Sequence, residues 1–258
     1  MLKSNLHPND SRINFDIENH FYSVDGNKIK YSVTQIIDQF FPEFDSEYWS
    51  RIKAKERLDF LGKKYSKEQL DQLQQKILGE WDVKRDEASK KGTILHETIE
   101  NYYKGIFTDD PPVEFSYFES FINKYPKMKP YKTEWRVFDS KASLAGTIDM
   151  VYEKPNGELF LFDWKRSSKL VNDIGAIIKS DFEYGFDELN NLSNNSYNKY
   201  CLQQNLYKYI LEENYDKKIS SMNILVLHPR HHKYFHLQLP SLKKETEFLV
   251  RKAREKSI

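Results

Sequence analysis

The stretch Glu158-Leu-Phe-Leu-Phe-Asp-Trp-Lys165 is an apolar run that ends in two charged side chains. Its alternation predicts a strand with Leu159, Leu161, Asp163 and Lys165 on one face and Phe160, Phe162 and Trp164 on the other. Asp163 and Lys165 would leave the end of that strand side by side, about 7 Å apart. A bare Asp-x-Lys is most often an ion pair at a strand end, so the pair alone does not indicate chemistry.

The preceding strand carries a second acid in an equally apolar setting. Leu144-Ala-Gly-Thr-Ile-Asp-Met-Val-Tyr152 contains Asp149, and a charge inside a strand is costly unless it is paired or bound to a metal. Two carboxylates on neighbouring strands can bind a hard cation such as Mg²⁺. Lys165 could hold or deprotonate a water, or neutralise charge on a phosphoryl group. The two strands together therefore predict a cation site near Asp149 and Asp163.

The first hundred residues are mainly helical after a small hairpin. The segment 20–31 alternates around the turn Asp25-Gly26. Ser32-Val-Thr-Gln35 and Ser66-Lys-Glu-Gln69 have the sequence of capping boxes, which open helices. The expected helices span residues 32–41, 45–61 with Asp45 or Ser46 as its cap, 66–79 ending near Gly79, and 80–104 ending at Gly105.

The remainder of the chain mixes strands with helices. The expected strands span 132–138, 144–152, 158–164, 222–227 and 234–239, and the expected helices span 197–214 and 241–256. Residues 168–198 are rich in Asn, Ser and Asp and predict a long surface loop. This order of elements predicts a mixed α/β or α+β domain.

Composition excludes several classes of protein and site. Among the 258 residues no apolar run approaches the ~20 needed to span a bilayer, and the N-terminus lacks the apolar core of a secretory signal. We therefore expect no membrane association. The single cysteine, Cys201, excludes an internal disulfide, a Cys-only zinc site and a cysteine-ligated iron–sulfur cluster. A cytoplasmic or other reducing intracellular location is the simplest expectation.

Net charge is nearly balanced, with 40 basic and 39 acidic residues. A polyanionic partner would therefore have to be bound by local basic patches, for which the segments 51–64 and 243–256 are candidates. Solvated faces of amphipathic helices are the simpler explanation of both segments.

Three motifs together resemble the RecB-like branch of the PD-(D/E)XK nuclease superfamily. They are Gly146-Thr-Ile-Asp149, Leu161-Phe-Asp-Trp-Lys165 and Gln203-Gln-Asn-Leu-Tyr207. In that branch Gly-x-x-Asp is followed by Asp-x-Lys at the end of the next strand and by Gln-x-x-x-Tyr on the next helix. The spacings fit, with 14 residues between the two aspartates and 38 from the lysine to the first glutamine. The resemblance covers roughly residues 91–227, and Ile148 stands where the superfamily's nominal motif has proline.

The resemblance implies a fold and an activity. It implies a restriction-endonuclease-like core at residues 91–258, with a central mixed sheet flanked by helices. An N-terminal hairpin and helical region at residues 1–90 would pack on that core, and the two regions would form one continuous structural domain. Including Tyr31-Ser-Val-Thr34, the chain looks closest to mitochondrial genome-maintenance exonuclease-like single-stranded DNA nucleases. The resemblance thus implies a Mg²⁺- or Mn²⁺-dependent deoxyribonuclease without an iron–sulfur cluster. Such an enzyme would degrade single-stranded DNA or flaps in repair, replication or defence.

The resemblance also assigns roles to residues. Asp149, Asp163 and the backbone carbonyl of Trp164 would bind the metal, His96 would complete the site, and Lys165 would help to activate water. Gln203 and Tyr207 would orient the lysine and the DNA backbone. Glu134 and Glu100 are candidates for an outer shell or a second metal.

Each of these assignments has a structural alternative. Taken alone, His96 is more often a core histidine, Glu134 is explained by a surface salt bridge, and Gln203 and Tyr207 by ordinary helix packing. Gln204 is the neighbouring glutamine but lies on a different helix face.

Two other functions remain open from the sequence. One is a catalytically inactive nucleic-acid-binding subunit of a larger repair or defence complex. The other is a metal site in His228-Pro-Arg-His-His-Lys-Tyr-Phe-His236, which contains four of the seven histidines. The second is disfavoured because the segment has the pattern of a hairpin tip and contains neither cysteine nor carboxylate.

Overall fold

The computed structural model describes residues 5–62, 64–179 and 182–256, which fall into two compact units. The smaller unit is Glu43–Ile94, and the larger unit combines the described residues up to Pro42 with those from Leu95 onward. Helix α3, Lys67–Lys104, contributes residues 67–94 to the smaller unit and 95–104 to the larger one. The division at residue 90 that the sequence suggests stays a prediction.

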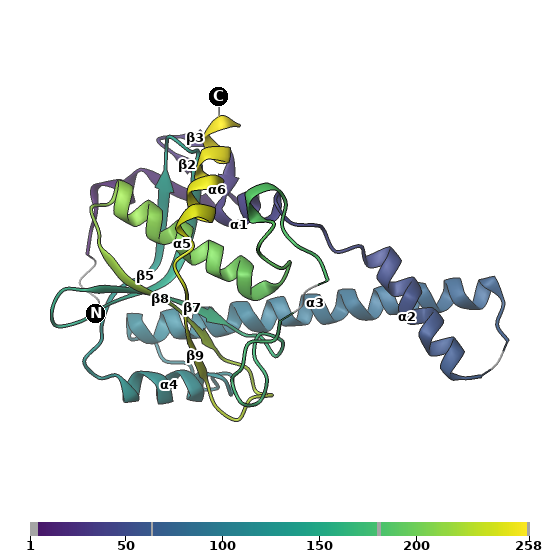
Figure 1. Ribbon diagram of the computed structural model, residues 1–258. Coiled ribbons are helices and arrows are strands. Elements are labelled where there is room, and N and C mark those ends of the chain that lie inside the picture. The colour runs from purple at the N-terminus through teal and green to yellow at the C-terminus, as the bar shows by residue number, and fades with distance from the viewer. Residues whose placement is uncertain (1–4, 63, 180–181, 257–258) are drawn as a thin grey trace. The chain divides into compact units, whose positions relative to one another are not determined.

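A mixed sheet forms the centre of the larger unit (Figure 1). Its strands are β4 (Tyr31–Ser32), β5 (Lys129–Asp139), β6 (Leu144–Glu153), β7 (Leu159–Lys165), β8 (Ile219–Val226) and β9 (Phe235–Gln238). Their order is β4-β6-β7-β8-β9, with β5 paired to β6. The β4–β6 and β7–β8 pairs are parallel, and the other pairs are antiparallel. With helices on both faces, this confirms the expected α/β (α+β) fold with a central mixed sheet.

A small antiparallel sheet precedes the central one. It consists of β1 (Ile13–Asp16), β2 (Phe21–Val24) and β3 (Asn27–Lys28). Asp25 and Gly26 both have positive φ, 51° and 80°, as the favoured two-residue hairpin turns require. The hairpin is therefore confirmed, whereas β1 was not expected because four alternating residues are too short a signal.

The helices of the larger unit flank the central sheet. They are α1 (Val33–Asp38), α4 (Phe115–Lys124), α5 (Ser196–Asn214) and α6 (Lys243–Glu255), with short 3₁₀ turns at Pro8–Ser11 and Asp187–Leu189. The capping box predicted at the start of α1 is present, because Ser32 and Gln35 each bond the other's backbone N–H through the side chain. Helix α4 was not expected from the sequence.

The smaller unit contains α2 (Ser46–Phe60) and residues 67–94 of α3. Asp45 caps α2 by accepting a hydrogen bond from the backbone N–H of Tyr48. The expected helix end near Gly79 is wrong, because α3 continues unbroken through Gly79 and Gly92. An isolated glycine costs a helix only about 1 kcal/mol, which flanking helix formers offset. The predicted stop at Gly105 is confirmed, and its φ is +76°.

Both faces of the central sheet are buried. On the α5 face a core cluster includes Leu161, Leu206 and Ile224, whereas on the α4 face an aromatic cluster includes Phe118 and Trp164. The predicted surface loop 168–198 is irregular up to residue 195 apart from one 3₁₀ turn and isolated bridges, and its last three residues belong to α5, which begins at Ser196. Residues 180 and 181 within it lie outside the described residues. In the described part of the chain no helix is both long and apolar enough to cross a membrane.

Candidate active site

One edge of strand β6 is left open between two neighbouring strands. Because β5 pairs with one edge along the length of β6, strands β4 and β7 share the other edge. There β4 pairs with Leu144 and Ala145, and β7 pairs with residues 150–153. Among the described strands none pairs with residues 146–149 on this edge. The Gly146-Thr-Ile-Asp149 motif occupies this gap.

Asp149 lies at the point where β6 and β7 part. The pairing of the two strands ends at Met150 and Phe162. Beyond it the backbone N–H of Trp164 donates to Oδ2 of Asp149 at 2.9 Å. The carboxylate therefore takes a position that a backbone carbonyl would hold in a continuous ladder, and its other oxygen remains available at the gap.

His96 reaches the same point from α3. Its Nε2 lies 2.8 Å from the carbonyl oxygen of Trp164, which can only accept, so this nitrogen carries the hydrogen. In the neutral ring Nδ1 then presents a lone pair, and it lies 3.6 Å from Oδ2 of Asp149. Two acceptors that face each other are stabilised by a cation between them, either a proton or a metal ion.

Glu134 brings a third donor from β5, with a strained backbone. Its φ is +45°, in the left-handed region that non-glycine residues seldom adopt inside a strand. It lies between Thr133 and Trp135, whose partners on β6 flank Asp149. Burial, together with the carboxylates of Asp149 and Glu100, raises the pKa of Glu134 to about 8. Such strain persists only where the surroundings enforce it, and it concentrates at functional sites.

These three side chains fit a divalent cation. The candidate ligand atoms of His96, Glu134 and Asp149 all lie within 4.8 Å of one another. Among the described residues no other group of three or more histidine, cysteine or acidic side chains comes this close together. Opposite ligands of an octahedral Mg²⁺ lie about 4.2 Å apart, so small side-chain rotations suffice. One imidazole with two carboxylates also suits Mn²⁺.

Asp163 and Lys165 form a buried pair at the end of β7. Oδ2 of Asp163 is 2.7 Å from Nζ of Lys165, and the aspartate side chain is only 3% exposed. The contact is close but has no hydrogen-bond geometry, so Oδ2 is buried without a hydrogen bond. Lys165 also lies over the ring of Tyr200, 4.4 Å from its centre. Oδ2 thus already faces one cation, the ammonium of Lys165.

The charge states of this pair follow from burial and from neighbouring carboxylates. Burial raises the pKa of Asp163 to about 6, because the attraction of Lys165 is partly offset by the repulsion of Asp149. For Lys165, burial lowers the pKa, but the attraction of Asp163 and Asp149 outweighs it and raises the pKa overall. Lys165 is therefore a cation at neutral pH.

The two adjacent glutamines of α5 have different contacts. Gln204 is fully buried, and its Nε2 donates to Oδ1 of Asp163 at 3.3 Å. Gln203 instead donates to the hydroxyl of Tyr207 at 3.4 Å. The structure thus brings Gln204, which the sequence reasoning set aside, against the central aspartate. The repeated glutamine was the available signal, but periodicity did not select between the two.

Tyr207 connects α5 to the glycine of the first motif. A Cβ atom added to Gly146 would lie 2.6 Å from Cε1 of the Tyr207 ring and 2.9 Å from its hydroxyl oxygen. Only glycine therefore allows the buried ring to lie against β6 at the open edge. This contact supplies a physical reason for a glycine and a tyrosine that are far apart in the sequence.

Glu100 lies outside the three-residue group. Its carboxylate is 2.6 Å from Nζ of Lys104, one helical turn along α3. It acts on the site at longer range, by raising the pKa of Glu134.

The histidine-rich segment has no comparable arrangement. It forms the connection between β8 and β9, and none of its histidines belongs to a potential metal-binding group within the described residues. His231 is buried with neither ring nitrogen hydrogen-bonded, and its Nδ1 lies 3.9 Å from Asp173. His236 instead bonds Asn223 at 2.9 Å. The segment is therefore a hairpin tip with individually placed histidines.

Comparison with known proteins gives only distant structural likeness. No protein-family model and no curated protein matches the chain. The solved structure of SSO0001 aligns with 86% of this chain and 74% of its own at 11% identity, with a TM-score of 0.32. A candidate exonuclease from Eubacterium rectale aligns over 65% of each chain at 12% identity, with a TM-score of 0.39. This chain thus spans less than two thirds of that protein, and at such scores the likeness carries no argument.

Proposed function

We propose that this protein is a Mg²⁺- or Mn²⁺-dependent nuclease of the PD-(D/E)XK type that hydrolyses phosphodiester bonds in DNA. The observation that carries the proposal is the meeting of His96, Glu134 and Asp149 within 4.8 Å, beside the buried pair of Asp163 and Lys165. A structural ion pair would explain Asp163 and Lys165 alone. It would not explain three further ligand-type side chains from three other elements.

The cation would be held by His96, Glu134 and Asp149, with Asp163 and the carbonyl of Trp164 adjacent to it. When bound, it supplies Lewis-acid chemistry by polarising a phosphoryl oxygen and lowering the pKa of a bound water. The carboxylates of Glu134 and Asp149 set the location of the cation, because positive charge between them relieves their mutual repulsion.

Lys165 would act as a fixed hydrogen-bond donor. Its ammonium is held between Asp163 and the ring of Tyr200, so it can orient the attacking water or contact a non-bridging phosphate oxygen. Water would then add at phosphorus as the P–O bond to the leaving group breaks, with the proton of the water released to solvent and the leaving oxygen protonated from solvent. Positive charge next to the phosphoryl oxygens would stabilise the charge that develops. Gln204 positions Asp163, and Tyr207 supports the open edge of β6.

The substrate we propose is single-stranded DNA or a flap, degraded from an end during repair, replication or defence. Support for this finer assignment comes from the motif resemblance, which spans Gly146 to Tyr207.

The test is a cleavage assay with end-labelled single-stranded DNA, double-stranded DNA and RNA in Mg²⁺, Mn²⁺ or EDTA. We expect metal-dependent cutting of single-stranded DNA by the wild type and none by Asp163→Ala. Asp110→Ala, which changes an exposed aspartate of the loop before α4, is the matched control and should cut normally. The size distribution of early products separates exonuclease from endonuclease action.

Two outcomes would contradict the proposal. Cutting that survives in Asp163→Ala would assign the activity to another site or to a contaminant. Binding of DNA without cleavage under any condition would favour the inactive nucleic-acid-binding subunit.

A further inference from the structure

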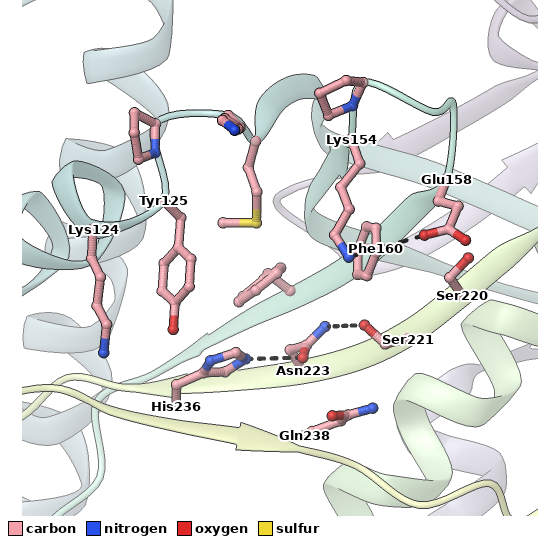
Figure 2. Close-up of a pocket in the computed structure, with 15 residues that line it drawn as sticks. Lys124, Tyr125, Lys154, Glu158, Phe160, Ser220, Ser221, Asn223, His236 and Gln238 are labelled. Atoms are coloured by element: carbon pink, nitrogen blue, oxygen red, sulfur yellow. Dashed lines mark hydrogen bonds and ion pairs between the residues drawn. The ribbon is translucent and has the colours of Figure 1, made fainter.

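A cleft of about 800 Å³ opens on the α4 face of the sheet, at the start of β7 (Figure 2). Phe160 of β7 lines its floor, Asn223 of β8 lines its far wall, and Tyr125 extends over it from the loop after α4. The nearly buried Phe162 also borders the cleft. The volume lies in the range of small-molecule sites, which are typically about 300–1,000 Å³.

The cleft exists because α4 is too short to cover its face of the sheet. The helix has ten residues, about 15 Å, whereas β6 beneath it has ten residues and extends about 34 Å. Phe118 and Phe121 of α4 cover Trp164 and Phe162, with ring centres 5.5 and 5.2 Å apart. Beyond Lys124 the helix ends, so no part of α4 covers the strip of sheet around Phe160, where the Lys154 side chain lies over the ring instead.

The rim of this cleft is positively charged. Lys124, Lys127 and Lys154 line it, against the single acid Glu158. Lys154 lies over the ring of Phe160, 4.2 Å from its centre, and only 4.0 Å from Glu158. In the described part of the chain Lys124 and Lys127 form no ion pair. Two ammonium groups are thus free to bind an anion beside an aromatic floor.

The far wall of the cleft offers hydrogen-bonding groups. Asn223 is fully engaged, because it donates to Leu161 and Ser221 and accepts from Nε2 of His236. The hydrogen bond to Asn223 leaves Nδ1 of the neutral imidazole as an acceptor. Burial, and to a smaller extent the positive charge of Lys124, lowers the pKa of His236. The side chains of Ser220 and Gln238 also line this wall.

We infer that this cleft binds a nucleotide unit, with its base on the aromatic floor and its phosphate at Lys124 and Lys127. A base stacks on rings without regard to sequence, and its polar edge would meet Gln238 and the imidazole of His236. The lysine ammonium groups on the rim act as point charges that bind phosphate, so the rim favours a phosphorylated ligand. An uncharged aromatic ligand would leave the lysines unused, and inorganic phosphate would leave the floor exposed.

The nucleotide cleft is separate from the proposed active site. It lies at the start of β7 on the α4 face, whereas Lys165 ends the strand on the other face, about 17 Å along the chain from Phe160. The inference goes beyond the proposed nuclease function and does not depend on it. A bound nucleotide there would be either a free mononucleotide or the 5′-phosphorylated end of a strand.

The experiment is calorimetric titration of the full chain with dAMP, deoxyadenosine, inorganic phosphate and a 5′-phosphorylated oligonucleotide, all in EDTA. We expect saturable binding of dAMP that Lys124→Glu/Lys127→Glu weakens about fivefold to tenfold. The control variant Lys243→Glu/Lys244→Glu, in the first turn of α6, should bind like wild type. All changed side chains lie at the surface, and thermal melting verifies folding.

The two sources give different results. Binding of dAMP identifies a free nucleotide, whereas binding of the phosphorylated oligonucleotide alone, with the same lysine dependence, identifies a strand end. The inference is overturned if deoxyadenosine or inorganic phosphate binds as well as dAMP, or if the lysine variant binds normally. It is also overturned if neither ligand binds to wild type. Because no cleavage is measured, an inactive nuclease site would not affect these outcomes.

Discussion

The two ends of strand β7 show two ways of placing charge on a sheet. At the carboxyl end, Asp163 and Lys165 are buried, and their charges are held by each other, by Gln204 and by the neighbouring carboxylate of Asp149. At the amino end, the strand itself stays apolar and the lysines stand on the rim of an open cleft. Substitutions at the carboxyl end of β7 should therefore have large effects that depend on geometry, whereas substitutions at the amino end should have small, additive effects.

The largest expected effect is loss of cleavage on removal of Asp163. We expect Asp163→Ala to lower the rate of DNA cleavage by about 10³-fold or more, because it removes a negative charge adjacent to the cation and the partner that positions the lysine. Single-turnover assays measure the rate, and DNA binding in EDTA should remain near wild type. Equal loss of binding and cleavage would indicate that Asp163 is only a structural partner of Lys165.

Replacement of Lys165 tests the other half of the buried pair. Lys165→Met should lower cleavage by roughly 10²- to 10⁴-fold while Mn²⁺ still binds, because the lysine acts on water or phosphate and is not a ligand. Calorimetry with Mn²⁺ and single-turnover cleavage separate the two properties. Loss of Mn²⁺ binding in this variant would contradict the role we assign to it.

The contact between Gly146 and Tyr207 should appear as a stability effect. Gly146→Ala places a Cβ atom 2.6 Å from the tyrosine ring, and we expect a loss of about 1–3 kcal/mol in the free energy of unfolding. Tyr207→Leu alone should also destabilise the protein by leaving a cavity. In the double variant the penalties should not add, because the alanine then has room. Strict additivity in urea unfolding would show that the two sites are independent.

The smallest expected effect is a pH dependence of folding stability that comes from His236, which lines the cleft at the amino end of β7. The folded-state pKa of His236 is lowered from 6.5, so below pH 6.5 the unfolded chain binds more protons than the folded chain. Its contribution to stability is therefore present above that pH and is lost as the pH falls toward the folded-state pKa. His236→Gln should flatten this part of the stability curve, measured by urea unfolding between pH 5 and pH 7. An unchanged slope would exclude His236 as its source.

The same comparison shows what could be predicted from the sequence. Strands β6 and β7 and helices α5 and α6 were predictable because their apolar periodicity runs over many residues, and the placement of Asp149 and Asp163 followed from it. Helix α4 was missed because its Phe-, Tyr- and Ser-rich sequence has few strong helix formers. It forms because Phe115, Phe118 and Phe121 are buried against the sheet.

The remaining features depend on contacts between distant segments. The left-handed backbone of Glu134 is imposed by its neighbours and has no sequence signature of its own. The selection of Gln204 over Gln203 depends on the rotation of α5 against β7, which the spacing of apolar residues cannot define on a helix buried on several sides.

The mixed topology of the sheet also has a consequence for the order of folding. Strands β5, β6 and β7 follow one another through short antiparallel connections, so they can pair early at a small loss of chain entropy. Strand β8 pairs in parallel with β7 only after the whole connection of residues 166–218, which includes α5, has closed. Contacts that span long stretches of chain form slowly. Asp163 and Lys165 would therefore meet within their own strand first, and Gln204 and Tyr207 would join them in a later step. The last part of the domain to fold would then be the part that completes the site.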